Sequence, residues 1–384
     1  MKEQKICKRC IMDTTAPGIW FDENGVCNFC KIHDTAQKDH PTDKDSEVKL
    51  NSLLEKIKNN GRGKKYDCIV GVSGGRDSTY TLYLTKKLGL RPLAVHCDNG
   101  WNSELSVTNI KKITEKLDVD LYTEVLDWEE FKDLQRAFLR ASVPDADIPA
   151  DMAINSVLFK AASKEKLKYI IWGKTLTQGK CPIGWSYGDH DLKYIKSLHK
   201  KFGNVKMDKF PRFSITDLIY FQFFKKIKSV TLFNYIEYNK DDVTKLLKNE
   251  LGWREYKEKH YENLYTIFIQ SYYLPKKFKI DKRKLHYSAL IRYGNMTREE
   301  ALNKTKENVY PEEELVSYVI SKLDISKEEF NEIMRSPPKT FMEYSNSFWL
   351  EKLLVKTAIK MGFLEKKFSF FEWDRLKGNW FLSQ

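Results

Sequence analysis

A six-residue loop, Ser73–Ser78 (SGGRDS), constrains the fold more than any other feature of this sequence. It follows directly on Tyr66–Val72, a short apolar, β-branched run that is typical of a buried strand. Apolar residues at helical spacing then run from Tyr80 to Leu88 and are ended by Gly89. A strand, a small-residue loop and a helix N-terminus in this order form an anion cradle, because glycines let backbone N–H groups approach phosphate oxygens and the helix dipole favours negative charge.

The same alternation of strands and helices continues after the loop. The loop itself is neither a Walker motif nor a G-x-G-x-x-G fingerprint, and the alternative is a chance turn, which its position between strand and helix disfavours. We expect further strands at 91–98, 120–125 and 169–173, and helices at 103–117, 128–140 and 151–166. Alternating elements of this kind predict an α/β fold with a doubly wound, Rossmann-like parallel sheet that binds ligands at the carboxyl ends of its strands.

The candidate site residues therefore lie where these strands end. We assign ATP binding to Ser73, Gly74, Gly75, Arg76, Asp77, Ser78, His96, Asp98 and Gly173, and catalysis to Asp77 and Lys174, with Asn99 and Thr175 at the same strand ends. Two of these residues have an alternative role. Asp77 is explained equally well as a helix N-cap or as a Mg²⁺-related carboxylate, and His96, inside a strand, is more often a packed residue than a catalyst. Cys68, in mid-strand, is expected in the core.

Four of the seven cysteines form two C-x-x-C pairs near the N-terminus: Cys7, Cys10, Cys27 and Cys30. Two thiolates three positions apart on a tight turn can take adjacent corners of a tetrahedron, so this spacing predicts a four-thiolate Zn²⁺ site. Asn24-Gly25 predicts the hairpin turn of a zinc ribbon just before the second pair. With four protein ligands the zinc would be structural and would stabilise a segment too short to bury its own core. A redox pair and a chance cluster are the alternatives.

The charge balance points to polyanions as partners. Lys and Arg number 66 against 53 Asp and Glu, a net charge of +13, which favours phosphates, nucleotides, nucleic acid or anionic lipid. No run approaches the roughly 18 apolar residues of a membrane-spanning helix, and the first ten residues have no signal-peptide character, so we expect a cytoplasmic protein without a membrane partner.

The sequence divides into four regions with different patterns. These are a zinc ribbon at 1–35, a polar connector with a helix at 36–64, the nucleotide domain at 65–185 and a basic, mainly helical region at 186–384. Within the last region, 193–228 mixes ten Lys and Arg with aromatic residues, which fits a nucleic-acid-binding face and a solvated surface over an aromatic core equally well. A second basic cluster spans 274–286, and two capping boxes begin helices at Thr297 and Ser326.

Together these segments resemble the N-acetyl sugar amidotransferases of bacterial surface-polysaccharide biosynthesis, members of the PP-loop ATP pyrophosphatase superfamily. The matching segments are Cys7–Thr15, Asn28–Cys30, Ser73–Ser78, His96–Trp101, Gly252–Tyr256, Gln270–Pro275, Ile280–Arg283 and Met296–Ala301. The last eighty or so residues add little to the resemblance. None of the cysteines outside the zinc set has the glycine-flanked elbow of a glutaminase nucleophile, so we expect that the chain does not make its own ammonia.

The resemblance implies an activity and its partners. The family turns the acetamido group of a nucleotide-linked N-acetyl sugar into an acetamidino group, using ATP, Mg²⁺ and ammonia from a separate glutaminase subunit. The amide oxygen is adenylated, pyrophosphate leaves, and ammonia then displaces AMP. The family match also suggests substrate-binding residues: His260, Gln270, Tyr272, Tyr273, Lys282 and Arg283. A thiolase-like tRNA-modifying enzyme and a non-catalytic zinc-ribbon binding module are the alternatives, and nucleic acid is not the expected partner.

Overall fold

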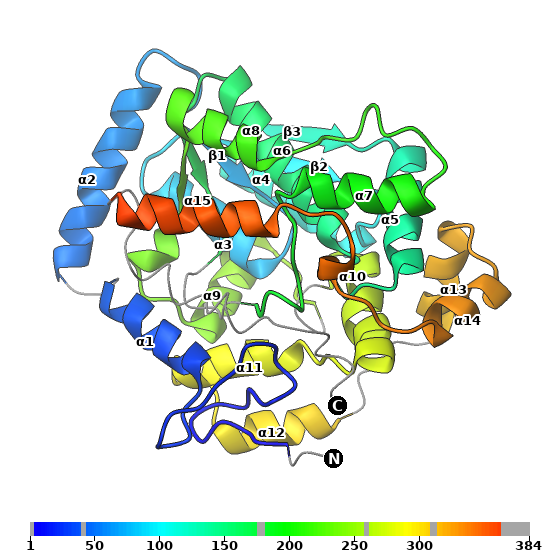
Figure 1. Cartoon of the computed structure of the whole chain (residues 1–384). Coiled ribbons are helices and arrows are strands. Elements are labelled where there is room, and N and C mark those ends of the chain that lie inside the picture. The colour runs from blue at the N-terminus through cyan, green and yellow to red at the C-terminus, as the bar shows by residue number, and fades with distance from the viewer. Residues whose placement is uncertain (1–3, 40–43, 175–180, 257–260, 308–312, 362–384) are drawn as a thin grey trace.

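A five-stranded parallel sheet lies at the centre of the molecule, with strands in the order β3-β2-β1-β4-β5 (Figure 1). The computed structural model describes residues 4–39, 44–174, 181–256, 261–307 and 313–361. The strands are β1 Cys68–Gly71, β2 Pro92–Asp98, β3 Leu121–Val125, β4 Tyr169–Ile171 and β5 Lys228–Val230. The strand order reverses between β1 and β4. Such a reversal opens a crevice at the carboxyl ends of the two strands, where open α/β sheets bind their ligands.

Helices cover both faces of this sheet. Cys68 and Val70 of β1 pack with the helices of one face, and Ile69, which points the other way, packs with those of the opposite face. The first face carries α2 Lys44–Gly61, α3 Arg76–Lys87, α4 Glu104–Leu117 and α9 Lys240–Leu246, and the second carries α5 Trp128–Ala141, α6 Ile148–Lys164 and α7 Leu192–Phe202. The predicted doubly wound parallel sheet is confirmed, and Cys68 lies in the core as expected.

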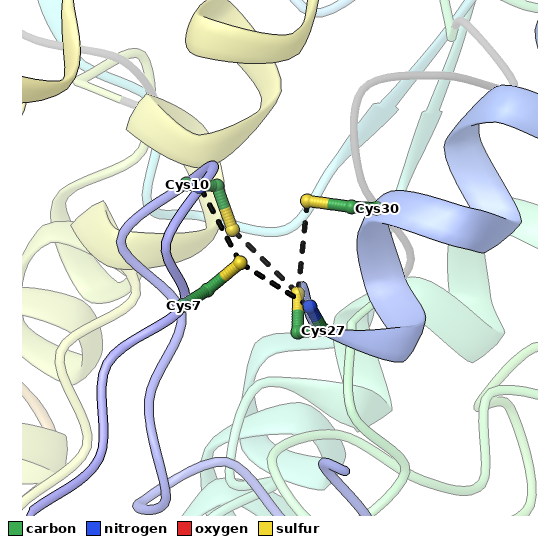
Figure 2. Close-up of side chains that lie close together, drawn as sticks. All are labelled: Cys7, Cys10, Cys27 and Cys30. Carbon is green, nitrogen blue, oxygen red and sulfur yellow. Dashed lines mark hydrogen bonds between the residues drawn. The ribbon is translucent and has the colours of Figure 1, made fainter. Parts of the chain in front are cut away.

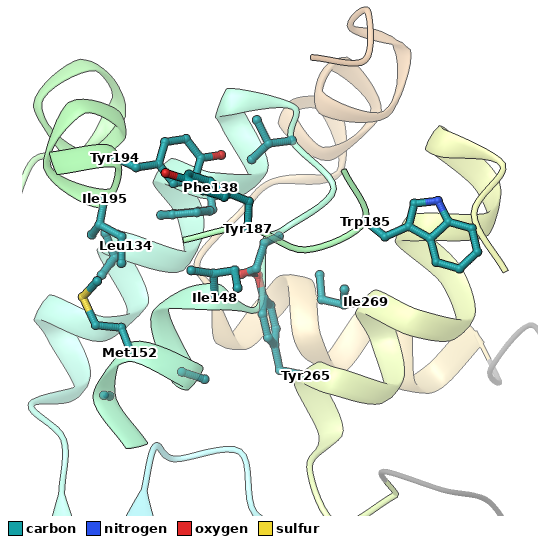
Figure 3. Packing of buried hydrophobic residues seen from close by; sticks show 14 of the residues in the cluster. Leu134, Phe138, Ile148, Met152, Trp185, Tyr187, Tyr194, Ile195, Tyr265 and Ile269 are labelled. Carbon is teal, nitrogen blue, oxygen red and sulfur yellow. Dashed lines mark hydrogen bonds between the residues drawn. The ribbon is translucent and has the colours of Figure 1, made fainter. Parts of the chain in front are cut away.

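The second half of the chain shares the larger core with the sheet (Figure 3). In this core Phe138 of α5 lies edge-on to Tyr194 of α7, with ring centroids 5.7 Å apart, and Tyr265 is 1% exposed. Burying one such aromatic side chain stabilises the fold by about 2 kcal/mol. Because one continuous core joins the two halves, the placement of the later helices relative to the loop is fixed by packing.

Most of the later helices are short, and they pack around the sheet. They are α8 Ile215–Ile219, α10 Leu264–Phe268, α11 Arg283–Arg292, α12 Arg298–Lys306, α13 Glu313–Lys322, α14 Lys327–Arg335 and α15 Phe348–Lys360, with the π-helical turns η1 Tyr220–Phe224, η3 Leu247–Leu251 and η4 Ile269–Phe278 and the 3-10 turns η2 Leu232–Asn234 and η5 Phe341–Glu343. None of the helices in the described ranges is long and apolar enough to cross a lipid bilayer.

The three N-cap residues expected from sequence are present, and one strand was not expected. Ser103 caps α4, and Thr297 and Glu300 form a complete capping box at the start of α12. Ser326 accepts the Glu329 N–H at 3.1 Å at the start of α14, but Glu329 Oε1 accepts from Arg140, so the second predicted capping box is only half formed. The strand β5 comes from the region expected to be mainly helical, and its three residues, two of them exposed, are too few and too polar to give a strand pattern.

Candidate functional site

The loop Ser73–Ser78, called the phosphate loop below, joins β1 to α3 and is shaped by its own hydrogen bonds. The Ser73 N–H donates to Ser78 Oγ at 3.2 Å, and Ser78 Oγ donates to the Gly75 carbonyl oxygen at 3.1 Å. Gly74 has a φ of 77°, and a Cβ added there would lie 2.6 Å from the Ser106 carbonyl oxygen. Since both the backbone angle and the close approach exclude a side chain, only glycine fits at this position.

The segment Gly252–Tyr256 holds the phosphate loop from behind. The Gly74 carbonyl oxygen accepts a hydrogen bond from Trp253 Nε1 at 2.9 Å and from the Tyr256 hydroxyl at 3.2 Å. Asn109 Nδ2 lies 3.4 Å from the same oxygen and donates to the Arg254 carbonyl oxygen at 2.9 Å. These contacts fix the orientation of the Gly74 peptide, which gives one of the family-like segments a physical role at the loop.

The end of β4 meets the start of α3. A Cβ on Gly173 would lie 2.8 Å from the Ser78 Cα and 2.9 Å from the Ser78 nitrogen, so a glycine lets the two chain segments touch. Lys174 follows, exposed, with its Nζ 4.9 Å from the centre of the Trp172 ring. Thr175 lies outside the described residues. The structure therefore brings the predicted residues of the β1 and β4 ends together at the crevice.

Asp77 is held by a tyrosine that the sequence analysis did not single out. The N-cap of α3 is Gly75, so Asp77 stands in the first helical turn and is not the cap. Its Oδ1 accepts the Tyr238 hydroxyl at 2.5 Å, and Arg76 Nε lies 3.3 Å from the same oxygen. Arg76 Nε also donates to the Tyr238 hydroxyl oxygen at 3.0 Å. Tyr238 could not be found from sequence because it is one of several aromatic residues in the run 232–238 and belongs to no motif.

His96 is a packed residue with both ring nitrogens in use. Its Nδ1 lies 2.9 Å from the Val72 carbonyl oxygen, which requires the proton on Nδ1, and its Nε2 accepts from Asn102 Nδ2 at 3.0 Å. Burial lowers the pKa of His96, which keeps the ring neutral. Asp98 Oδ1 accepts from the same Asn102 amide at 2.9 Å and from the Gly100 N–H at 2.9 Å. Of the two roles considered for His96, the structure shows the packing role.

Glu262 lies over the phosphate loop and was also missed. Its Oε1 would be 3.2 Å from a Cβ on Gly75. The Ser103 N–H donates to the Glu262 carbonyl oxygen at 2.9 Å, and the Leu264 N–H donates to the Trp101 carbonyl oxygen at 2.9 Å. The segment around Glu262 thus runs across the carboxyl end of β2. His260, which precedes it, lies outside the described residues.

Three aspartates gather near Lys174 at the start of α6. Burial, with the nearby charge of Asp147, raises the pKa of Asp151 to about 7, and Lys174 opposes this shift. Asp151 is nonetheless exposed at the surface, so its carboxyl group is accessible to a ligand. Asp189 accepts from His190 Nδ1 at 2.7 Å, and the pKa of Asp189 is lowered because this contact and the charge of Lys174 outweigh its burial.

Among the substrate-side candidates that lie in the described residues, Lys282 lies near these aspartates. Its charge acts on the carboxyl groups of Asp145 and Asp151 and lowers their pKa values. Arg283 instead spends all five of its N–H groups inside the chain: it pairs with Asp281 at 2.8 Å and donates to three carbonyl oxygens at the end of α12. It therefore closes a helix end and has no donor left for a substrate.

The remaining substrate candidates lie in packed positions along α10 and η4. Tyr273 is 0% exposed and donates to the Val143 carbonyl oxygen at 3.2 Å. Tyr272 stacks on Phe268 and Phe330. Gln270 is half-buried in η4. The basic cluster at 274–286 is mostly used in the same way, and its Lys277 binds carbonyl oxygens at the end of α14.

The buried Asp145 gives a pH-dependent stability that can be measured. It is 4% exposed, it accepts the Tyr194 hydroxyl at 3.0 Å, and burial raises its pKa to about 7. The folded chain therefore holds a proton that the unfolded chain releases near pH 4, so stability falls as pH rises from about 4 to about 7.

We expect Asp145→Asn to remove this loss while keeping the acceptor for Tyr194. The variant should gain up to about 4 kcal/mol over the native chain at pH 8, with little difference at pH 4. Urea unfolding across this pH range measures the effect. If the variant differed from the native chain by the same free energy of unfolding at pH 4 and pH 8, the raised pKa of Asp145 would be contradicted.

The four N-terminal cysteines converge on one point (Figure 2). Their sulfurs all lie within 4.8 Å of one another and all four side chains are fully buried. The Sγ atoms of Cys10 and Cys27 are 3.6 Å apart, and those of Cys27 and Cys30 are 3.7 Å apart. Four sulfurs at about 2.3 Å from one tetrahedral ion are about 3.8 Å apart, so the arrangement fits a single metal ion. A four-iron cluster binds each sulfur to a different iron and spreads them more widely.

Two arginines tie this cysteine cluster to α11 and α12. Arg292 is 7% exposed and directs Nε at Cys30 Sγ, 3.4 Å away, and Nη2 at Cys10 Sγ, 3.5 Å away. Arg298 donates to the carbonyl oxygens of Cys7 and Cys10 at 3.1 to 3.2 Å. The predicted hairpin turn is present, since Gly25 has a φ of 76° and its N–H donates to the Asp22 carbonyl oxygen. The N-terminal segment, including α1 Asn28–Asp39, is thus docked on the C-terminal half.

Comparison with known proteins gives partial matches. The chain is 29% identical over 179 residues to an uncharacterized protein of Methanocaldococcus jannaschii, and this alignment covers 46% of this chain and 61% of that protein. Among solved structures it is similar to an NMN synthetase from Francisella tularensis, with 15% identity, a TM-score of 0.27 and coverage of 55% of this chain and 87% of that one. It is also similar to the U34-tRNA thiolase NcsA of Methanococcus maripaludis, which carries a [4Fe-4S] cluster, with 14% identity, a TM-score of 0.31 and coverage of 83% and 95%.

TM-scores of this size do not establish a common fold, so the fold assignment rests on the strand order and the phosphate loop. The family match concerns the C-terminal part of the chain, from Glu262 beside the loop to the middle of α15. Residues 262–356 match the C-terminal domain of the WbpG-like LPS biosynthesis proteins.

Proposed function

We propose that this chain is the synthetase subunit of an ATP-dependent, AMP-forming amidotransferase of surface-polysaccharide biosynthesis. It converts the acetamido group of a nucleotide-linked N-acetyl sugar into an acetamidino group with ammonia from a separate glutaminase. The observation that carries the proposal is that the phosphate loop and the family-matched segment lie side by side. The phosphate loop stands at the crevice between β1 and β4, and the part of the chain that is similar to LPS biosynthesis proteins begins at Glu262, beside Gly75 of that loop.

The geometry supports specific roles at the ATP. Backbone N–H groups of the loop and the start of α3 would bind the leaving pyrophosphate, because the helix N-terminus favours negative charge. A Mg²⁺ ion prefers one or two carboxylates together with phosphate oxygens, and Asp77 and Asp98 supply carboxylates beside the loop and at the β2 end. When bound, the ion would neutralise charge developing on the phosphates. Lys174 would stabilise negative charge on the α-phosphate from the β4 side.

The second half of the reaction needs a proton acceptor. Ammonia that attacks the adenylated carbon becomes a cationic amine, which must lose a proton before AMP leaves. Asp151 is suited to this task because its pKa is about 7, it is exposed, and the charges of Lys174 and Lys282 lie near it. A base whose pKa lies near the working pH is in the right protonation state for half of the molecules and still accepts a proton readily.

Replacing Asp151 with Asn should separate the two half-reactions. We expect amidine formation to slow by about 100-fold, while adenylation, measured by exchange of radioactive pyrophosphate into ATP, changes little. In the native enzyme the rate should fall below about pH 7 as Asp151 gains its proton, and the variant should lose this inflection. An unchanged pH profile in the variant would rule out Asp151 as the base.

The reaction itself is tested with the purified full-length chain. ATP, an ammonium salt and a nucleotide-linked N-acetyl sugar are expected to yield pyrophosphate, AMP and a sugar product lighter by one mass unit, because oxygen is replaced by an NH group. Nucleotide sugars without an N-acetyl group are the control. Pyrophosphate release that depends on tRNA and not on the sugar would overturn the proposal.

A thiolase-like tRNA-modifying activity is the second candidate, and the two remaining thiols near the site argue against it. Sulfur transfer usually uses a thiolate, but burial raises the pKa of Cys97 to about 12 and also raises the pKa of Cys181. We therefore expect Cys97→Ser and Cys181→Ser to keep activity within about threefold and to keep the metal. Loss of activity in either variant, with metal content intact, would favour the thiolase.

A further inference from the structure

The α8–η1 segment carries an exposed apolar face that the proposed reaction does not use. Ile219, Tyr220, Phe223 and Phe224 are spaced so that a helical turn places them on one side, and they are 36%, 45%, 62% and 75% exposed. Phe221, on the other side, is buried in the core. The Tyr220 and Phe224 rings stack with centroids 6.1 Å apart, which makes one continuous aromatic surface.

Six lysines surround this face: Lys64, Lys166, Lys168, Lys225, Lys226 and Lys228. Hydrogen bonds place them together, since Lys168 Nζ donates to the Lys225 carbonyl oxygen at 2.6 Å and Lys64 Nζ donates to the Lys166 carbonyl oxygen at 2.8 Å. None of the six forms an ion pair with a carboxylate in the described part of the chain. The acids close to these lysines in the sequence are Asp67, Glu165 and Asp217. Asp67 pairs with Arg91, and Asp217 is tied to Ser214 in a capping box.

This surface lies away from the phosphate loop. Lys168 and Lys228 stand at the amino ends of β4 and β5, whereas the loop stands at the carboxyl end of β1. In Figure 1, α8 is at the opposite end of the molecule from α11 and α12. The lysines are therefore not part of the ATP site, and their charge needs another partner.

We propose that the α8–η1 face and its six lysines form a docking surface for an anionic lipid bilayer. Exposed Phe and Ile side chains insert at the boundary between headgroups and acyl chains, Tyr stays at the headgroup level, and lysines bind the anionic headgroups. The apolar part of the surface is an exposed helical face, and its charges are mostly lysines, since the nearby Arg91 is paired with Asp67. This favours an extended anionic surface over single-stranded nucleic acid, which is bound in a basic groove. A peripheral contact of this kind revises the expectation that the chain has no membrane partner.

The test is co-sedimentation of the full-length chain with vesicles of three parts phosphatidylcholine to one part phosphatidylglycerol. We expect binding to these vesicles, weak binding to pure phosphatidylcholine, and a loss of affinity of about tenfold in Phe223→Ser/Phe224→Ser and in Lys225→Gln/Lys226→Gln/Lys228→Gln. The matched controls are Trp349→Ser/Leu353→Ser on α15, which removes side chains that are 60% and 62% exposed, and Lys111→Gln/Lys112→Gln on α4. Both controls should bind like the native chain.

Three results would overturn the proposal. One is vesicle binding that the α8–η1 variants do not weaken, or that the α15 control weakens equally. Another is binding of a single-stranded RNA, without vesicle binding, that Phe223→Ser/Phe224→Ser abolishes. The third is a change of oligomeric state in that variant, by light scattering, without vesicle binding, which would make the face an interface between copies of the chain.

Discussion

Gly74→Ala is expected to lower pyrophosphate release from ATP by at least about 100-fold, because the phosphate loop would have to move. A Cβ at this position would stand 2.6 Å from the Ser106 carbonyl oxygen, a backbone atom of α4 that cannot turn aside. The Gly74 carbonyl oxygen would also be pushed away from Trp253 Nε1 and the Tyr256 hydroxyl. The backbone N–H groups that would bind the phosphates belong to the same loop peptides. A shift of Gly74 would therefore move these donors out of position.

Gly63→Ala is the matched control for this prediction. Gly63 has a φ of 76°, nearly the angle of Gly74, but a Cβ there would have nothing within 4 Å. Both variants therefore carry the same backbone strain, about 1 kcal/mol, and only Gly74→Ala carries the clash. We expect Gly63→Ala to keep nucleotide affinity and activity within about twofold.

Titration with a fluorescent ATP analogue, pyrophosphate release and thermal unfolding should be measured on both variants. If the two lose activity equally, strain and not the loop geometry is responsible, and the role of the phosphate loop is contradicted. A folded Gly74→Ala variant with native nucleotide affinity would contradict it as well.

The central sheet and the loop could be predicted because their signals are local. Strand β1, the loop and α3 follow one another within about twenty residues, and each carries its own pattern of apolar residues, glycines and polar ends. The four cysteines were predictable for the same reason, since two residues between ligands set their geometry directly. In contrast, β5 has three residues and no apolar pattern, so only its neighbour β4 makes it a strand.

The composition of the site from distant segments could not be predicted. Tyr238 reaches Asp77 across 161 positions, and the Glu262 side chain lies beside Gly75 while its backbone is bound to Ser103; neither residue has a sequence signal. Lys282 and Arg283 are adjacent basic residues, yet one faces the aspartates and the other closes the end of α12. Only the packing of α11 against α12 decides which of the two is available to a ligand.

Loss of the metal is expected to have the second large effect, because the cysteine cluster also positions α11 and α12. We expect one zinc ion per chain by elemental analysis, and none in Cys10→Ser. Structural zinc binding is worth about 10 kcal/mol or more, so the metal-free segment 4–39 should unfold. Arg292 and Arg298 would then lose their partners at Cys7, Cys10 and Cys30, and hydrogen exchange in α11 and α12 should become faster.

Arg292 allows a finer test of the same coupling. A site of four thiolates with Zn²⁺ carries two negative charges, and the buried guanidinium lies 3.4 Å from Cys30 Sγ and 3.5 Å from Cys10 Sγ, where it offsets them. We expect Arg292→Met to release zinc to a chelator about 10 to 100 times faster than the native chain, and Arg292→Lys to fall between the two. Cys97→Ser is the control thiol and should release zinc at the native rate.

Native hydrogen-exchange rates in α11 and α12 of the metal-free chain would show that the cysteine cluster does not hold these helices. Iron in place of zinc would keep the ligand set but overturn the identity of the metal, which makes elemental analysis the first measurement to perform.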